Sequence, residues 1–246
     1  MSIAPQVVPY KNDKGSKKQQ VAKMFDNISP KYDLLNRLLS FGIDKYWRNM
    51  MVGKLKNLKP SNILDIATGT GDVAIACLKL NPEKIVGVDI SEGMMELGRE
   101  KLKKLGLTDK IELKFGDSEK LPFSDKTFHA VTVAFGVRNF ENLDKGLSEI
   151  FRVTKKGGMT VILEFSKPKG IIMAPLYQFY SSNVLPFIGR LISSDQSAYT
   201  YLPESVKAFP EGEPFLVRLR GAGFEDCRLQ RLTFGIVSIY TGSKKS

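Results

Sequence analysis

The chain has 246 residues, of which 42% are apolar and 26% charged, and its formal net charge is +11. This length and composition fit one large domain with a real core and exclude the disordered and fibrous classes. Two cysteines, 150 residues apart, and a single histidine provide no disulfide framework, no metal-ligand spacing and no serine–histidine–aspartate triad, and they favour a reduced, cytosolic compartment.

The first 60 residues predict a basic tail followed by helices. Residues 1–20 are polar and lysine-rich, which predicts a mobile tail. Over residues 21–60 apolar side chains recur at helical spacing, interrupted at Pro30, and this predicts a helical cap. Residues 1–60 carry twelve Lys or Arg against four Asp or Glu, a net charge of +8, so most of the basic excess lies at this end.

From residue 62 onward, short apolar strands alternate with helices. Five strands are predicted at 62–67, 84–90, 111–117, 128–136 and 159–166, and four helices at 71–80, 92–106, 142–154 and 212–223. Two further strands within 224–244, joined near Gly235, are expected to form a hairpin at the sheet edge. Such alternation is typical of a doubly wound, mostly parallel sheet, so we predict one α/β domain with seven strands over residues 21–246.

One long uncharged segment interrupts this alternation. The 20 residues between Lys169 and Arg190 contain no charge, but polar residues lie at the centre and Pro175 and Pro186 lie on either side. A membrane-spanning helix needs about 20 mostly apolar residues, so this is a poor span. We expect a broken, amphipathic lid over 170–200 that covers a pocket or lies in a membrane interface.

The first predicted strand ends in a glycine-containing loop, in the order Asp65-Ile66-Ala67-Thr68-Gly69-Thr70-Gly71-Asp72. Gly69 and Gly71 allow a ligand to approach the backbone closely. Asp89, at the end of the second strand, is placed to accept hydrogen bonds from a ribose diol. Because both NAD and S-adenosylmethionine (SAM) contain that ribose, Asp89 alone does not distinguish them.

The charges around this loop favour SAM. A pyrophosphate would lie at the helix N-terminus, where Asp65 and Asp72 would repel it, whereas both acids favour a sulfonium and an ammonium group. Asp117, followed by Ser118, comes after the third strand, where it could hold an adenine amino group. We therefore predict a SAM site at this edge. The alternative is that the acids only cap helices.

Several segments resemble the demethylmenaquinone/ubiquinone biosynthesis C-methyltransferase family, a group of class I SAM-dependent methyltransferases with a Rossmann-like fold. They are Tyr32-Asp33-Leu34-Leu35-Asn36, Leu39-Ser40-Phe41-Gly42-Ile43, Trp47-Arg48, Asp65 to Asp72, Phe135-Gly136-Val137-Arg138-Asn139, Leu163-Glu164-Phe165-Ser166-Lys167-Pro168 and Tyr201-Leu202-Pro203-Glu204-Ser205-Val206. The resemblance covers the chain from about Val21 onward.

This resemblance implies a set of cofactor contacts. The residues that contact SAM would be Thr70, Asp89, Asp117 and Ser118. Tyr32 would close over the cofactor, although a helix-packing role is the alternative. Residue 134 would line the same pocket. Some family members have a serine there, whereas this chain has Ala134, whose side chain cannot hydrogen-bond.

The resemblance also implies transfer of a methyl group to a ring carbon of a prenylated quinol, with demethylmenaquinol preferred. The ring carbon becomes nucleophilic when a neighbouring hydroxyl ionises, and phenols titrate near pH 10. Arg138 is assigned to stabilise that phenolate and Asn139 to orient water or the quinol oxygen, a surface salt bridge being the alternative for Arg138. His129 begins the fourth strand, roughly 20 Å from the reacting edge, and is expected to be structural.

Partners and rival functions follow from the charge. Basic ends and an apolar lid favour peripheral contact with an anionic membrane, at the inner face of the cytoplasmic membrane, although a merely solvated surface is the alternative. A nucleic-acid methyltransferase would suit the charge, but the Asn/Asp-Pro-Pro-aromatic element and a loop cysteine are missing, so no nucleic-acid partner is expected. A non-catalytic scaffold that binds SAM or lipid is the second rival. No metal is expected, and a homodimer is left open.

Overall fold

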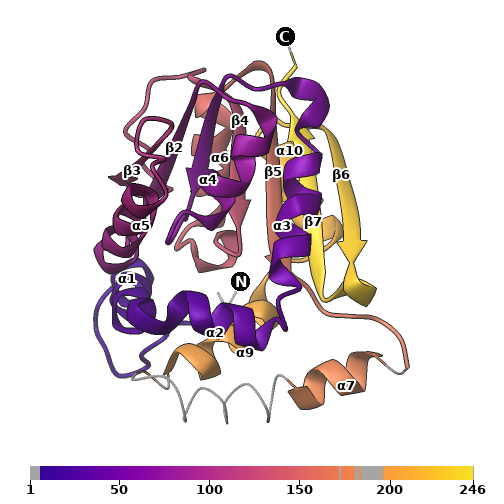
Figure 1. Cartoon of the computed structure of the whole chain (residues 1–246). Coiled ribbons are helices and arrows are strands. Elements are labelled where there is room, and N and C mark those ends of the chain that lie inside the picture. Colours follow the sequence, from indigo (N-terminus) through magenta and orange to yellow (C-terminus); the bar gives the residue numbers. More distant parts are fainter. Residues whose placement is uncertain (1–5, 172, 181–182, 184–194, 196, 246) are drawn as a thin grey trace.

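The computed structural model describes residues 6–171, 173–180, 183, 195 and 197–245 (Figure 1). Its sheet has the strand order β3-β2-β1-β4-β5-β7-β6. The strands are β1 (Asn62–Ile66), β2 (Lys84–Asp89), β3 (Ile111–Phe115), β4 (Phe128–Ala134), β5 (Thr154–Phe165), β6 (Glu225–Leu232) and β7 (Val237–Ser243). The first five are parallel, and β7 pairs antiparallel with both β5 and β6. The predicted seven-stranded, mostly parallel sheet with an edge hairpin is confirmed.

Helices cover both faces of the sheet. The described α-helices, including those of the N-terminal cap, are α1 (Lys17–Ile28), α2 (Tyr32–Leu39), α3 (Asp44–Gly53), α4 (Asp72–Cys77), α5 (Glu92–Lys104), α6 (Leu143–Val153), α7 (Met173–Phe179), α9 (Ser197–Ala208) and α10 (Glu213–Gly221). Short 3-10 turns include η4 (Val137–Asn139) and η6 (Thr233–Gly235). Helices α3, α4 and α5 lie on the near face in Figure 1, and α6 and α10 lie behind.

The central strands are buried on both faces, which explains their nearly continuous apolar sequences. Successive side chains of a strand point to opposite faces. Ile63 therefore packs with Trp47 and Val73 on the α3–α4 side, whereas Leu64 packs with Ile150 and Phe215 on the α6–α10 side. The two clusters form a single three-layered domain.

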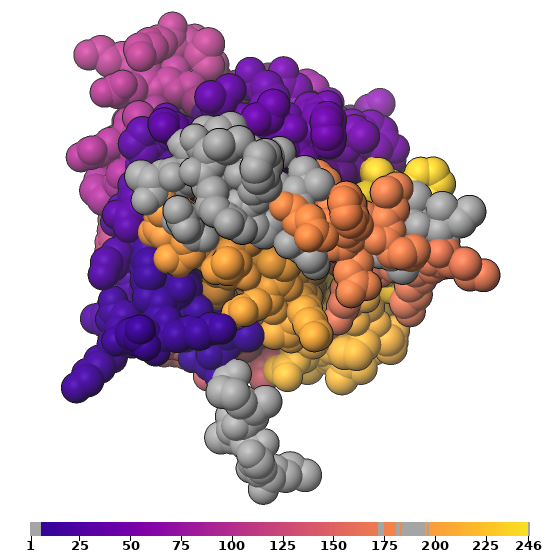
Figure 2. Space-filling model, turned by 90° about the horizontal axis from the view of Figure 1, so that it is seen from below, coloured from indigo at the N-terminus to yellow at the C-terminus, as the bar shows by residue number. Residues whose placement is uncertain are grey.

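The N-terminal helices form a cap across the carboxyl ends of the parallel strands. Val21 and Met24 of α1 pack with Met94 of α5 and with Tyr199 and Tyr201 of α9. Figure 2, which looks onto this end, shows the indigo N-terminal segment and the orange of α7 and α9 across it. The cap predicted over residues 21–60 is thus helical as expected.

Two predicted boundaries differ from the structure. Ser16 caps α1 in a capping box with Gln19, so Lys17–Gln20 are helical and do not belong to the tail predicted over residues 1–20. The predicted helix over 142–154 ends at Val153, and β5 begins at Thr154, because Thr154 already pairs with Phe128 of β4. Much of the lid predicted over 170–200 lies outside the described residues.

Candidate active site

Two adjoining hollows lie at the carboxyl edge of the parallel strands, beneath the cap. The larger is a cavity of about 510 Å³ and the smaller is a pocket of about 60 Å³. Their walls share Phe25, Tyr32, Ala67, Gly69, Ala134 and Phe135. Because these six residues belong to both walls, a ligand in the smaller pocket would meet a ligand in the larger cavity at this boundary.

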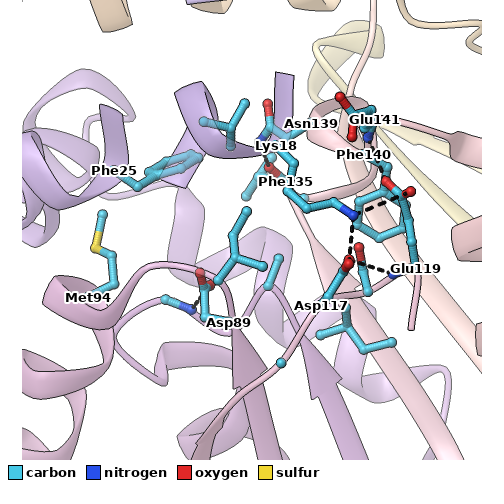
Figure 3. A pocket seen from close by; sticks show the side chains of 18 of the residues that line it. Lys18, Phe25, Asp89, Met94, Asp117, Glu119, Phe135, Asn139, Phe140 and Glu141 are labelled. Atoms are coloured by element: carbon cyan, nitrogen blue, oxygen red, sulfur yellow. Dashed lines mark hydrogen bonds and ion pairs between the residues drawn. The ribbon is translucent and has the colours of Figure 1, made fainter. Parts of the chain in front are cut away.

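The glycine loop is held to the end of β2 by Asp89. One carboxylate oxygen of Asp89 accepts a hydrogen bond from the Gly69 amide at 2.8 Å, and the other accepts one from the Ser91 amide at 2.9 Å. Gly69 and Gly71 have φ angles of +55° and +84°, which strain any other residue. Burial raises the pKa of Asp89. Asp89 lies on the wall of the smaller pocket, where the predicted ribose contact would be made (Figure 3).

Tyr32, predicted to close over the cofactor, lies at the start of α2 against this loop. A β-carbon built on Gly69 would be 3.9 Å from Cε1 of the Tyr32 ring. The ring also makes an edge-on contact with Phe25 of α1, with ring centroids 6.0 Å apart. Tyr32 therefore packs with the cap and also lines both hollows, so its two predicted roles are compatible.

Asp117 and Ser118 line the smaller pocket, and a lysine that the sequence did not single out faces Asp117. Lys18 Nζ lies 2.6 Å from Asp117 Oδ2 and 3.6 Å from Glu119 Oε2 (Figure 3). These contacts join the first turn of α1 to the loop after β3. Lys18 was missed because it lies in the segment expected to be a mobile tail.

Asp65 does not reach either hollow, contrary to the prediction that it faces the ligand's positive groups. Its carboxylate is 1% exposed and accepts hydrogen bonds from Thr68 Oγ1 at 2.6 Å and from Thr132 Oγ1 at 2.7 Å. Burial raises its pKa to about 6. Asp65 therefore buttresses the glycine loop from behind. Gly71, the N-cap of α4, is likewise absent from both walls.

Asp72, the other acid expected to favour a cation, lies in an ion-pair network instead. Its carboxylate contacts Arg48 of α3 and lies 3.0 Å from Lys101 Nζ of α5. Those two cations lower its pKa. Lys101 Nζ also donates to the Asp33 carboxylate and to the Thr70 hydroxyl, which in turn donates to Asp33 at 2.7 Å. Thr70 and Asp72 line the larger cavity, so this network connects the cofactor loop with the cap.

Arg138 lines the larger cavity and forms a buried ion pair. Its Nη1 lies 2.9 Å from Oε1 of Glu164, and the two side chains are 8% and 0% exposed. The guanidinium also bonds the Phe135 carbonyl and the Ser205 hydroxyl, and it lies 5.5 Å from the centre of the Phe165 ring. The alternative of a surface salt bridge is therefore wrong. Burial raises the pKa of Glu164, and Arg138 opposes that shift.

Asn139 directly follows Arg138 in η4, but it lines the smaller pocket. Its Oδ1 accepts a hydrogen bond from the Tyr201 hydroxyl at 3.1 Å, and its amide nitrogen donates to the Phe135 carbonyl at 3.4 Å. It does not belong to the wall of the larger cavity, so the structure gives no contact for the role predicted for it, orienting the acceptor's oxygen.

Lys17 fixes η4, the turn that carries Arg138 and Asn139. Its buried Nζ donates to the carbonyls of Arg138 and Phe140, each at 3.0 Å. Burial and the neighbouring Arg138 lower the pKa of Lys17 to about 8. Neither Lys17 nor Glu164 was predicted to act at the site. Glu164 had a sequence signal, since it is a charged residue next to the end of an otherwise apolar, buried strand.

His129 lies apart from both hollows. Its Nδ1 accepts a hydrogen bond from the Asn62 amide at 3.2 Å, at the amino end of β1. The prediction that it is structural agrees with this position. Among the described residues no group of His, Cys, Asp and Glu side chains could hold a metal ion.

The larger cavity has a mainly aromatic and aliphatic wall. Trp47, Phe135 and Phe165 pack together, with ring centroids 4.5 to 6.4 Å apart. Tyr177 and Tyr201 add to this wall, and burial raises the pKa of each to about 12. Both tyrosines are therefore neutral hydrogen-bonding groups at pH 7. Such a wall suits a large apolar ligand with a few polar atoms.

The residues of the smaller pocket fit SAM. Asp89 and Asp117 could accept hydrogen bonds from hydroxyl and amino groups, and Met94, Ile90 and Phe25 offer an apolar surface that a purine ring could contact. Burial raises the pKa of Asp89, whereas the backbone amides of Ser91 and Gly69 oppose that shift and hold the carboxylate at the wall. When bound, SAM supplies an electrophilic methyl group on a sulfonium.

This sheet, loop and acidic pocket define a SAM-dependent methyltransferase of the Rossmann-like class. A solved structure of a SAM-dependent methyltransferase from Thermotoga maritima superposes with a TM-score of 0.63 at 19% identity, covering 91% of this chain and 99% of that one. At that identity the likeness shows the fold alone.

The model of the ubiE/COQ5 methyltransferase family matches residues 13–244, and the chain belongs to this family. It is 52% identical over 239 residues to a demethylmenaquinone methyltransferase of Bacteroides fragilis, covering 97% of each chain. It is 45% identical over 230 residues to a ubiquinone/menaquinone biosynthesis C-methyltransferase of Geotalea daltonii, covering 93% of this chain and 97% of that one. The protein is thus a SAM-dependent methyltransferase of quinone biosynthesis.

Proposed function

We propose that the protein methylates a ring carbon of a prenylated demethylquinol, and that demethylmenaquinol is its substrate. The observation that carries this proposal is the apolar cavity of about 510 Å³ that shares a wall with the SAM pocket. The buried guanidinium of Arg138 lies on that cavity's wall. The relatives named for demethylmenaquinone support the choice of ring.

The reaction needs a nucleophilic carbon beside an ionised hydroxyl. A carbon–carbon bond forms as the carbon–sulfur bond of the donor breaks, the sulfur keeps the bonding electron pair, and the ring carbon then loses its proton. Arg138 stabilises the phenolate, and burial strengthens this interaction because the local dielectric is low. Its Nη1 and Nε contact Glu164, Phe135 and Ser205, so we assign Nη2 to the phenolate oxygen.

Direct methyl transfer tests this function. The protein would be incubated in detergent with methyl-labelled SAM and a short-chain demethylmenaquinol kept reduced, and the product identified by mass spectrometry. We expect label on the ring carbon. A demethylated ubiquinone precursor serves as the second acceptor. SAM binding without label in either quinol would support the scaffold alternative and refute the proposal.

The location of the acceptor leads to a second part of the proposal. Prenylated quinols dissolve in membranes, so we propose that the protein attaches peripherally to the inner face of the cytoplasmic membrane. The described helices include none long and apolar enough to cross a membrane.

Whether the protein forms a homodimer stays a prediction, which size-exclusion chromatography with light scattering would decide.

A further inference from the structure

Exposed apolar side chains gather at one end of the molecule. Eight of the twelve large apolar side chains that are exposed in the described structure belong to three segments: α2 with the turn into α3, the segment 171–179 containing α7, and η6. All three segments lie at the carboxyl edge of the parallel strands, at the bottom of Figure 1, and Figure 2 looks onto that face. We call Leu34, Leu38, Phe41, Ile43, Leu176 and Phe179 the mouth patch.

Helix α2 is apolar on two sides. Leu35 is buried in the cap core and Leu39 packs against that core, whereas Leu34 and Leu38, four residues apart, form a separate exposed stripe. A helix of eight residues that needed only to cover the core would carry polar residues on this outer side. The outer stripe therefore indicates a second apolar partner.

The turn after α2 presents an aromatic ring to the outside. Phe41 has a φ angle of +52°, a conformation that is uncommon for bulky residues, and its side chain is 83% exposed. Within the described structure, packing of the Phe41 ring does not compensate for this backbone strain. It is consistent with a ring that packs against something outside the chain.

The charges around the mouth patch have one sign. Arg37 and Lys45 are exposed beside it, as are Lys167 and Lys169 before α7. The acids of this region are paired with cations: Asp33 with Lys101, Asp44 with Arg48, and Glu211, which also contacts the Lys167 amide, with Arg231. An anionic surface would complement the patch, and a lipid bilayer offers both phosphate groups and an apolar interior.

The mouth patch is continuous with the larger cavity. Phe41, Ile43 and Leu176 are exposed and also line the cavity wall. Apolar surface therefore extends from the outside to the aromatic interior next to the SAM pocket. A prenyl chain that followed this surface would not have to cross water.

We propose that the mouth patch is a membrane-docking face, which seats the entrance of the cavity in the headgroup region of an anionic bilayer. The stripe of Leu34 and Leu38, together with Phe41 and Phe179, enters the acyl boundary, while the surrounding Arg and Lys contact lipid phosphates. The inference rests on the proposed function for its biological purpose, but the docking itself requires neither SAM nor quinol.

Flotation of the full chain with vesicles tests the proposal. The vesicles would contain phosphatidylcholine and phosphatidylglycerol and no quinol. The double variant Leu34→Glu/Leu38→Glu should lower the partition coefficient by at least about tenfold, because two apolar side chains that would be buried in the acyl boundary become charged. The matched control, Leu105→Glu/Val217→Glu, alters two apolar residues of similar exposure on the end of α5 and on α10. It adds the same negative charge and should bind within about twofold of the unmodified chain, since a few unit charges are weakly felt at a distance.

Circular dichroism and SAM calorimetry would show whether each variant is folded, and Phe179→Glu on α7 provides a second, independent variant. Equal losses for patch and control variants would overturn the proposal, as would unmodified protein that fails to bind these vesicles. A dimer that Leu34→Glu/Leu38→Glu converts to monomers, with vesicle binding intact, would assign the patch to a second copy of the chain. Methylation in detergent is independent of docking, so its absence would refute the proposed function alone.

Discussion

Arg138 illustrates how one residue's surroundings define its role. Its charge is largely balanced by Glu164, so the pair can remain buried, while the guanidinium stays at the cavity wall. Burying the Arg138 guanidinium without Glu164 would cost free energy. Full neutralisation by Glu164, however, would leave no charge to stabilise the phenolate. The geometry fits a group that responds to charge developing on the acceptor.

We predict that Arg138→Gln lowers kcat by about 10²–10³-fold with little change in SAM affinity, because the charge acts mainly in the transition state. The deficit should shrink as pH approaches the quinol's own pKa, near 10 by the tyrosine reference. Single-turnover kinetics across pH, with SAM calorimetry, would check this. Asp89→Asn is the contrasting variant and should weaken SAM binding. If Arg138→Gln instead loses SAM affinity and retains turnover, Arg138 belongs to the cofactor site.

Asp65 predicts a pH-dependent stability. Its folded-state pKa of about 6 lies above the ordinary 3.8, so the folded state holds this proton more tightly than the unfolded state. The resulting stabilisation is complete below about pH 4 and is lost as pH rises to about 6, a change of about 3 kcal/mol. Asp65→Asn removes this titration. Urea unfolding of both proteins from pH 4 to 7 should show the unmodified chain losing stability relative to the variant, and parallel profiles would contradict the shift.

At the scale of elements, α5 packs unusually close to the cofactor loop. A β-carbon on Gly98 would lie 2.6 Å from the Leu113 side chain and 3.2 Å from the carbonyl carbon of Thr70. The glycine therefore permits the approach of helix and loop. Because the Thr70 backbone belongs to the loop, a larger residue would have to displace it.

We predict that Gly98→Ala destabilises the protein by about 1–3 kcal/mol and weakens SAM binding, since overpacking outweighs the gain in helix propensity. Gly53→Ala, in α3, is the control, because its added carbon would meet nothing within 4 Å beyond its chain neighbours and its own helix backbone. It should stabilise the protein by about 0.5–1 kcal/mol. Urea unfolding and calorimetry measure both effects. A stabilised Gly98→Ala variant with normal SAM affinity would show that the contact is not tight.

The sequence predicted the elements well where local pattern decides them. The buried strands depend on neighbouring residues, and so does the helix predicted over 92–106, which is found as α5 with Ser91 as its N-cap and Gly106 at a φ of +66° after it. The sequence did not show the direction in which Asp65 points, because β1 is buried on both faces and its apolar pattern does not distinguish them. Nor did it reveal Lys17 and Lys18, whose partners lie about 100 residues further along the chain. A run of lysines by itself predicts a solvated surface. Only the folded structure shows that acids and carbonyl groups lie next to these lysines.

At the scale of the whole molecule, the uneven charge predicts salt-sensitive attachment to membranes. Residues 1–60 carry a net charge of +8, and the mouth patch lies partly in this range. Screening shortens electrostatic attraction to a few ångströms at high salt. We predict that the protein binds anionic vesicles at low salt and that about 0.5 M salt releases much of it. Neutral vesicles are the control, and equal binding to both kinds at both salts would leave only the apolar contribution.

The position of β7 in the sheet has a consequence for how the chain is made. β7 comes after every other strand in the sequence, yet it lies between β5 and β6 and pairs with both. While the ribosome is still synthesising residues 237–243, β5 has an open edge and β6 has no neighbour in the sheet. The glycine loop and the cap can assemble earlier around β1 to β4, but the sheet is complete only after β7 has emerged. Until then the nascent chain exposes an apolar strand edge, the feature that chaperones bind and that aggregation exploits.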